Sequence, residues 1–199
     1  HDQFGNTPHV AAPTMDNELL RDLFKHVIEA TEILGVDGAL RTNLAELRDK
    51  LPPDQIGPTG YLQEWLQAYD DPGHRHCSHL VGLFPGDEIS PFYTPTLAQA
   101  ALVSVRNRGP GITGAGRIGW GQAWRLNLRD RLLDGDDAYL VLTNLIYDST
   151  LSTNLIFSNN QNRQLDCIYG TLSGIAEMFL QSHSGELHLL PALPTALTN

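Results

Sequence analysis

The chain has 199 residues, of which 41% are hydrophobic, and its formal net charge is -10. This length and composition suit one globular domain or a piece of a larger one. An acidic chain without a basic patch disfavours binding to a nucleic-acid backbone, and no run approaches the roughly 20 apolar residues of a membrane helix.

Hydrophobic residues recur at three- and four-residue steps through most of the chain, and this spacing predicts helices. Loops rich in glycine, proline and histidine separate these segments. The predicted helices cover residues 14–34, 39–51, 94–108, 120–133, 136–146 and 171–182.

Capping and breaking residues mark the ends of several predicted helices. Thr14 or Asp16 is expected as the first N-cap, and Gly35 ends that helix. Pro95 stands at the first position of the third helix, where proline is well tolerated. Asp136 or Asp137 is expected to cap the fifth helix.

The C-terminal segment differs from the rest. Residues 186–194 alternate between apolar and polar side chains and are interrupted by prolines, so we expect a strand that leaves the helical body. The fold class predicted from this pattern is all-α, a bundle or toroid with long loops that can carry chemistry.

One of these loops holds three of the eight histidines, His74, His76 and His79, together with Arg75 and Cys77. Histidine and cysteine are good zinc ligands, but a fixed positive charge at Arg75 opposes a nearby cation. Two other interpretations remain open. The segment is a structural polar loop, or its arginine and histidines donate hydrogen bonds to an uncharged polyol.

Two further segments place carboxylates near helices. Glu64 stands beside Trp65, whose indole could stack on a sugar, although a surface glutamate next to a core tryptophan explains the pair equally well. Asp166 is the one acidic residue of residues 164–170. It is either a capping carboxylate favoured by the helix dipole or a base at the rim of a site.

Several motifs, taken together and in order, carry a resemblance to a known family. They begin at Pro13-Thr14-Met15-Asp16-Asn17-Glu18 and end at His188-Leu189-Leu190-Pro191-Ala192-Leu193-Pro194. Between them lie Gln63-Glu64-Trp65, His74-Arg75-His76-Cys77-Ser78-His79, Gly82-Leu83-Phe84-Pro85-Gly86, Gly119-Trp120, Ala123-Trp124, Arg131-Leu132-Leu133-Asp134-Gly135 and Gly174-Ile175-Ala176-Glu177-Met178. The co-linear order resembles glycoside hydrolase family 95, the inverting α-L-fucosidases, which also includes some α-L-galactosidases.

The resemblance implies a fold and a division of the chain. Residues 1–184 would form the C-terminal half of an (α/α)6 barrel, and residues 185–199 would begin a C-terminal β-domain. A half barrel exposes a large apolar face, so we expect an upstream segment of the same polypeptide or a partner chain to cover it. The expected protein is secreted and uses neither a metal nor a cofactor.

The resemblance also implies roles for individual residues. Asp166 matches the aspartate that, with a pair of upstream asparagines, activates water in this family. The general acid is expected in a Ser-Pro-Glu motif before His1, with Glu64 as the second choice. Arg75 and His76 match a substrate-binding pair, and Trp65 and His79 are further candidate sugar contacts. His79 is also considered, with His74, as a support for that pair.

The expected activity is release of terminal 1,2-linked α-L-fucose from oligosaccharides or glycoconjugates, with inversion at the anomeric carbon. The alternatives are an α-L-galactosidase and a sugar-binding or scaffold fragment without catalysis. The family's usual Asp-Gly-Asn-Phe-Gly stands here as Asp166-Cys167-Ile168-Tyr169-Gly170. Cys77 and Cys167 each lie beside a matched motif, so they are either two buried thiols or a disulfide in an oxidising compartment.

Overall fold

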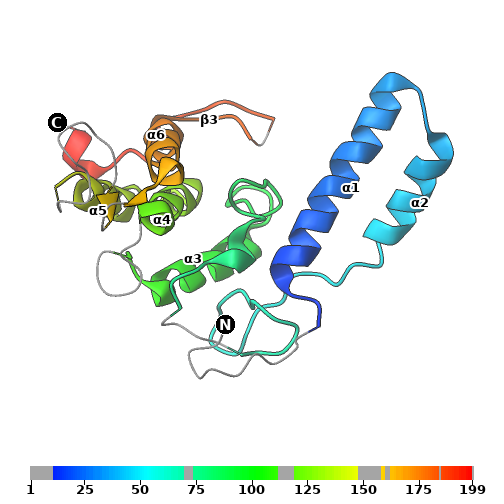
Figure 1. Cartoon of the computed structure of the whole chain (residues 1–199), viewed down its shortest axis with the longest axis horizontal. Coiled ribbons are helices and arrows are strands. Elements are labelled where there is room, and N and C mark those ends of the chain that lie inside the picture. Colours follow the sequence, from blue (N-terminus) through cyan, green and yellow to red (C-terminus); the bar gives the residue numbers. More distant parts are fainter. Residues whose placement is uncertain are drawn as a thin grey trace.

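The computed structural model describes residues 11–69, 74–111, 119–147, 158–159, 162–183 and 185–198. The prediction of an all-α fold is confirmed in these residues, where helices dominate and the strands have two residues each. An α-hairpin, α1–α2, stands on one side, and α4, α5 and α6 are grouped on the other (Figure 1).

The hairpin consists of α1 (Thr14–Leu34) and α2 (Gly38–Arg48). Gly35 ends α1 as predicted, and its φ of +67° is a conformation that glycine adopts without strain. The predicted N-cap is wrong. Pro13 occupies the cap position, and the Thr14 hydroxyl donates instead to the Gln63 carbonyl at 2.6 Å, which fixes the start of α1 to a distant loop.

A first core lies between α3 (Pro95–Arg108) and the loop before it. Alanines of α3 allow the loop to approach closely, and the end of the histidine segment forms a short 3₁₀ helix, η1 (Ser78–Leu80), which contains His79. Loop side chains buried in this core include Leu62, Leu80, Leu83 and Ile89.

A second core lies among α4 (Gly119–Arg131), α5 (Gly135–Tyr147) and α6 (Leu165–Phe179). The last helix corrects a prediction, because α6 begins at Leu165 rather than at residue 171 and ends at Phe179. Gly174 explains how α6 approaches α4. A Cβ added there would lie 2.4 Å from Cγ of Leu126.

Short strands close the described fold. The pair β1 (Ser158–Asn159) and β2 (Asn162–Arg163) is antiparallel, as is the pair β3 (Leu180–Gln181) and β4 (His188–Leu189). Of the strand predicted over residues 186–194, only His188–Leu189 forms a strand, and it pairs with β3 at the end of α6 instead of leaving the helical body. Beyond it, Ala192 is buried in the second core, and its carbonyl oxygen lies 2.4 Å from where a Cβ on Gly135 would stand.

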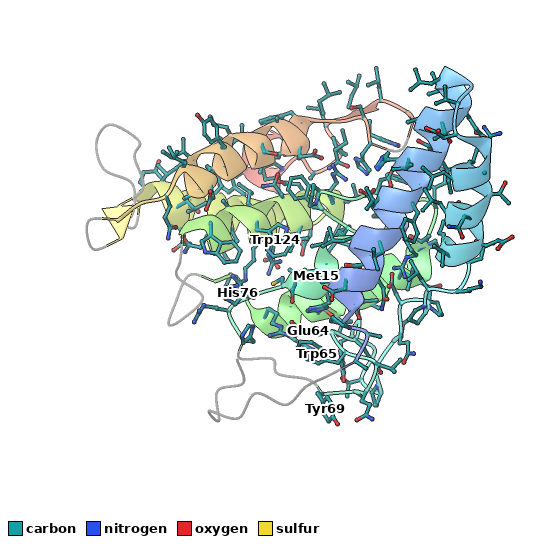
Figure 2. The ribbon with its side chains drawn as sticks, turned by 45° about the vertical axis from the view of Figure 1, so that its right-hand side comes forward. Met15, Glu64, Trp65, Tyr69, His76 and Trp124 are labelled. Atoms are coloured by element: carbon teal, nitrogen blue, oxygen red, sulfur yellow. The ribbon has the colours of Figure 1, made fainter. Side chains whose placement is uncertain are left out.

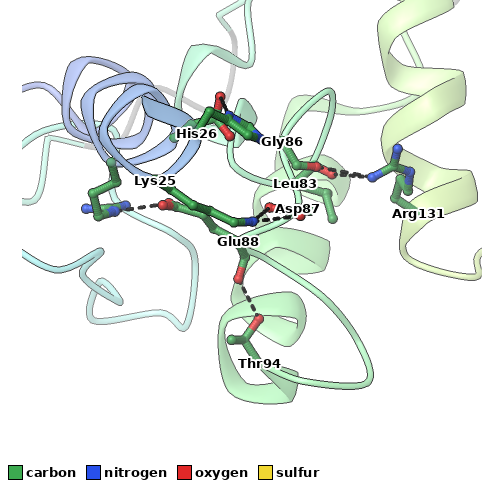
Figure 3. A network of polar contacts seen from close by, with 10 residues as sticks. Lys25, His26, Leu83, Gly86, Asp87, Glu88, Thr94 and Arg131 are labelled. Atoms are coloured by element: carbon green, nitrogen blue, oxygen red, sulfur yellow. Dashed lines mark hydrogen bonds and ion pairs between the residues drawn. The ribbon is translucent and has the colours of Figure 1, made fainter. Parts of the chain in front are cut away.

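Hydrogen bonds and ion pairs of charged side chains connect α1 and α4 to the turn at residues 83–88 (Figure 3). Arg131 of α4 donates to the carbonyls of Leu83 and Gly86 and pairs with Glu177 of α6. Lys25 of α1 pairs with Asp87 at 2.9 Å. Among the described residues, none of the helices is both long enough and apolar enough to cross a membrane.

Candidate active site

The helix α4 holds the histidine loop. The His76 ring stacks on the Trp120 indole, with 5.0 Å between centroids and 27° between planes. One turn further along, Trp124 donates its indole N–H to the Phe84 carbonyl at 2.9 Å. Figure 2 shows His76 and Trp124 beside α4, on the side that faces Glu64 and Trp65. The N-terminal part of α4 thus contacts both ends of the segment from His76 to Phe84.

Arg75 and His76 form a pair at the surface of the loop. Arg75 is exposed, His76 is half-buried, and the Arg75 Nε donates to His76 Nε2 at 3.0 Å. This hydrogen bond requires an unprotonated Nε2. Burial lowers the pKa of His76, and the positive charge of Arg75 lowers it further, so the ring is neutral at pH 7. The pair offers guanidinium and imidazole donors to an uncharged ligand.

Glu64 lies beneath this pair as a hydrogen-bonded carboxylate. It accepts from the Ser78 hydroxyl at 2.6 Å and from Arg108 Nη2 at 2.8 Å. Burial alone would raise the pKa of Glu64, but the facing His79, the Ser78 hydroxyl and the Arg108 charge outweigh it and lower that pKa. Glu64 is therefore ionised at neutral pH, whereas a general acid must hold a proton.

His79 lies inside the fold rather than at its surface. It is 2% exposed, and its Nδ1 is 4.0 Å from Glu64 Oε2. Burial lowers the pKa of His79 to about 4, so the imidazole is neutral at pH 7 and Arg108 supplies the charge that compensates Glu64. The buried position of His79 fits the role of a support for the Arg75–His76 pair.

Trp65 is half-buried two residues after Gln63, whose amide donates to the Trp65 carbonyl.

Asp166 lies in the first turn of α6 and is exposed. Its segment meets the histidine loop at Trp120, because the Trp120 backbone N–H donates to the side-chain oxygen of Gln164 at 3.2 Å. Trp120 therefore contacts His76 through its ring and the start of α6 through its backbone. Two segments about 90 residues apart in the sequence converge at one end of α4.

Both cysteines are buried free thiols. Cys77 packs in the first core and Cys167 in the second, so the disulfide alternative is not formed in this structure. Within the part of the chain that the structure describes, no three His, Cys, Asp or Glu side chains are grouped so that they could hold a metal ion.

A cavity of about 310 Å³ lies elsewhere, between α1, the 81–88 turn and His183. None of the residues predicted to contact substrate lines it. The buried Glu18 does, and burial raises the pKa of that carboxyl to about 9, so it is protonated at neutral pH. The candidate site is therefore the surface formed by Arg75, His76 and Trp120, where hydrogen-bond donors and an aromatic ring converge.

Sequence reasoning did not assign a role to Trp120, Ser78, Arg108 or Arg125. Trp120 was noted only as part of a motif, because nothing in the spacing shows that its ring meets His76. Arg125 and Arg108 sit in helices as ordinary members of a helical pattern. Their contacts reach across 50 and 44 residues of sequence, and local patterns carry no signal at that range.

The chain is similar to known proteins over most of its length. Residues 2–179 match the glycosyl hydrolase family 95 catalytic domain. The chain is 34% identical over 194 residues to alpha-L-fucosidase 2 of Arabidopsis thaliana, an alignment covering 91% of this chain and 22% of that protein. It is 28% identical to probable alpha-fucosidase A of Aspergillus niger and 29% identical to that of Aspergillus oryzae, over 88% and 90% of this chain.

The chain spans 23% and 28% of those two fungal proteins, so it corresponds to about a quarter of the length of these relatives. The mostly helical fold is consistent with part of a helical barrel domain. With nearly the whole chain matched, the chain belongs to glycosyl hydrolase family 95, within its catalytic domain.

Proposed function

We propose that this chain is part of the catalytic domain of an α-L-fucosidase that releases terminal 1,2-linked fucose with inversion. The observation that carries the proposal is the junction at Trp120, which joins the Arg75–His76 pair to the segment of Asp166. The names of the relatives, all α-fucosidases, support fucose as the sugar.

In this proposal Arg75 and His76 bind the sugar. A fucosyl group is uncharged and carries hydroxyls that accept and donate hydrogen bonds. The exposed guanidinium of Arg75 donates, while the neutral ring of His76 keeps one nitrogen as donor. The indole of Trp120 provides apolar surface beside the pair for the less polar face of the ring, and Trp65 stays a proposed further contact.

Asp166 orients the attacking water. An inverting glycosidase needs one carboxyl group to protonate the leaving oxygen and a second group to activate water on the opposite face. Asp166 is exposed in the first turn of α6, where a water molecule can reach its carboxyl group.

The general acid is proposed to come from outside the described residues. Glu64 was the second choice for this role, but its lowered pKa leaves it ionised, and both its oxygens already accept hydrogen bonds from Ser78 and Arg108. A glutamate in the upstream Ser-Pro-Glu motif that the family resemblance implies remains our proposal for the acid.

The test is release of fucose from a 1,2-fucosylated oligosaccharide by the whole protein, with the first-formed anomer followed by NMR. The proposal predicts β-L-fucose as that product. Asp166→Asn should lower kcat by about 10²–10⁴-fold, the usual contribution of a positioned acid or base. Asp16→Asn is the matched control, because Asp16 is also an exposed acid in a first helical turn.

Near-normal turnover by the Asp166→Asn variant would exclude the role of Asp166, and retention of configuration would exclude the inverting mechanism. Preferential cleavage of α-L-galactosides would identify the α-L-galactosidase alternative. The ionised state of Glu64 favours a second candidate, a sugar-binding unit without catalysis. Binding of L-fucose without any turnover of the oligosaccharide would support it.

A further inference from the structure

We propose that Arg125 is a positioning residue for the Arg75–His76 pair, holding it from inside the protein through the backbone of Arg75. The inference rests on the proposed function, because it assigns Arg125 a part in presenting that pair to the sugar. Arg125 lies in α4 and is itself 1% exposed, so it does not reach the surface on which a sugar would bind.

The contact that defines this role is a long-range hydrogen bond. Arg125 Nη2 donates to the Arg75 carbonyl at 2.9 Å, across 50 residues of sequence. Its Nη1 donates to the Gly121 carbonyl one turn back in α4 at 3.3 Å. The guanidinium therefore links the helix backbone directly to the loop backbone at the residue that precedes His76.

The hydrogen bond from Arg125 to the Arg75 carbonyl acts together with a second contact from α4, which is made to the His76 ring. Trp120, five residues before Arg125 in α4, stacks on that ring. The backbone N–H of His76 donates in turn to His74 Nδ1 at 3.2 Å. The Arg75 side chain is exposed, and its Nε donates to His76 Nε2 at 3.0 Å. Contacts from α4 thus hold both the Arg75 carbonyl and the His76 ring to which that side chain is bonded.

Arg125 also acts on His76 through its charge. The groups that affect His76 are Arg75 and His74 from its own loop, Arg125 from α4 and Glu64 from the loop before α3. After burial, the two arginines and His74 lower the pKa of His76, and Glu64 alone raises it. Removing the Arg125 charge should raise the pKa of His76, and protonation of Nε2 would then break its hydrogen bond from Arg75.

Burial of a charged guanidinium costs free energy unless its hydrogen bonds and surroundings compensate. Burial and the charges of Arg108 and Arg129 lower the pKa of Arg125, yet a guanidinium stays protonated at neutral pH. A methionine or leucine would fill the same space in α4 without this cost. The hydrogen bonds that Arg125 donates to the carbonyls of Gly121 and Arg75 therefore give a reason for an arginine at this buried position.

Two variants of the whole protein test the proposal. Arg125→Lys keeps the charge but cannot span both carbonyls, and Arg125→Gln removes the charge. Arg129→Lys and Arg129→Gln are matched controls, because Arg129 is buried one turn further along α4 and pairs with Asp134 and Asp137 instead. The measurements are kcat/KM for a 1,2-fucoside, the pKa of His76 by NMR titration and the melting temperature.

We expect Arg125→Lys to lower kcat/KM by about 100-fold, the effect of a small misplacement of a binding group. Arg125→Gln should raise the pKa of His76 and move the acidic limb of the pH–rate profile in the same direction. The Arg129 variants should lower the melting temperature while leaving kcat/KM and the His76 titration close to wild type.

The proposal would be overturned if the Arg125 variants lost stability like the controls but kept wild-type kcat/KM and an unchanged His76 titration. The outcome for fucose hydrolysis is separate. A wild-type protein without fucosidase activity would contradict the proposed function, while a raised His76 pKa in Arg125→Gln would still support the link between Arg125 and the pair.

Discussion

The Glu64 carboxylate is held by a hydrogen bond from Ser78 and an ion pair with Arg108. Its side chain is 11% exposed and that of Arg108 is 3% exposed, so their ion pair at 2.8 Å lies largely away from water. A buried pair of this kind contributes little compared with apolar packing, but the loss of one partner leaves an uncompensated charge inside the fold. The structure therefore makes Glu64 an anchor for the segment between Ser78 and Arg108.

Glu64→Gln should therefore lower the free energy of unfolding by about 3–5 kcal/mol at pH 7, measured by urea denaturation. Because the folded-state pKa of Glu64 lies below its ordinary value of 4.5, the stabilisation is present above pH 4.5 and is lost as pH falls through the folded-state pKa. The difference between wild type and variant should shrink across that acidic range.

Ser78→Ala is the control for this prediction. It removes one hydrogen bond to the carboxylate but keeps the ion pair with Arg108. The expected cost is about 1.5–3 kcal/mol, with the dependence on acidic pH retained. If Glu64→Gln were as stable as wild type at pH 7, the pairing with Arg108 would not be what holds this segment.

At the scale of elements, the start of α6 was the least predictable boundary. Residues 165–170 were predicted to be a loop just before the last helix, with Asp166 as their one acidic residue. In the structure α6 begins at Leu165 and includes them, and its small residues pack against α4. Gly170 and Gly174 lie against Ala123 and Leu126. Glycine, usually a sign of a turn, here permits close helix packing.

Other elements were predictable because their signals are local. The end of α1 follows from Gly35 and the start of α3 from Pro95, because each residue acts within one turn of its helix end. The histidine loop was identified as a candidate site for the same reason, since His74, Arg75 and His76 are adjacent. Its supports were not identified, because Trp120 and Arg125 reach it only through tertiary packing.

The close packing of α6 on α4 gives a direct test. In an exposed helix, Gly→Ala stabilises by up to about 1 kcal/mol. Gly174→Ala should instead destabilise by about 1–3 kcal/mol, because its Cβ would overlap Leu126. Gly38→Ala in α2 is the matched control, since a Cβ there would lie 4.0 Å from Nη2 of Arg41, which is an ordinary van der Waals contact.

Thermal or urea unfolding of the Gly174→Ala and Gly38→Ala variants measures the change in stability that each substitution causes. A Gly174→Ala protein that is more stable than wild type would mean that α4 and α6 are further apart than described. Loss of stability in Gly38→Ala of the same size would mean that the effect does not depend on helix–helix contact.

At the scale of the whole molecule, apolar side chains remain exposed on two separate parts. Ile33 and Leu34 of α1 are 85% and 71% exposed, and Leu189 near the other end is 78% exposed. We propose that these side chains belong to surface that another polypeptide segment or a partner chain covers. The further polypeptide or partner chain proposed to cover it fits a chain that spans about a quarter of its relatives.

The 199-residue chain produced by itself should therefore self-associate and bind a hydrophobic dye. We expect a hydrodynamic size above that of a 21.9 kDa monomer in size-exclusion chromatography, and dye fluorescence that falls when the whole protein is measured instead. A monodisperse monomer without dye binding would show that these faces need no cover.

The return of the C-terminal segment over α5 has a consequence for biosynthesis. Ala192 fills the second core, its carbonyl lies against Gly135, and Thr195 donates its backbone N–H and its hydroxyl to the Asp136 carboxylate at 2.7 and 2.9 Å. Because a ribosome makes these residues after α4, α5 and α6, the three helices leave the exit tunnel before the piece that completes their packing. Until that piece emerges, the packing around Gly135 and the hydrogen bonds to Asp136 are incomplete, so this part of the core can close only late in synthesis.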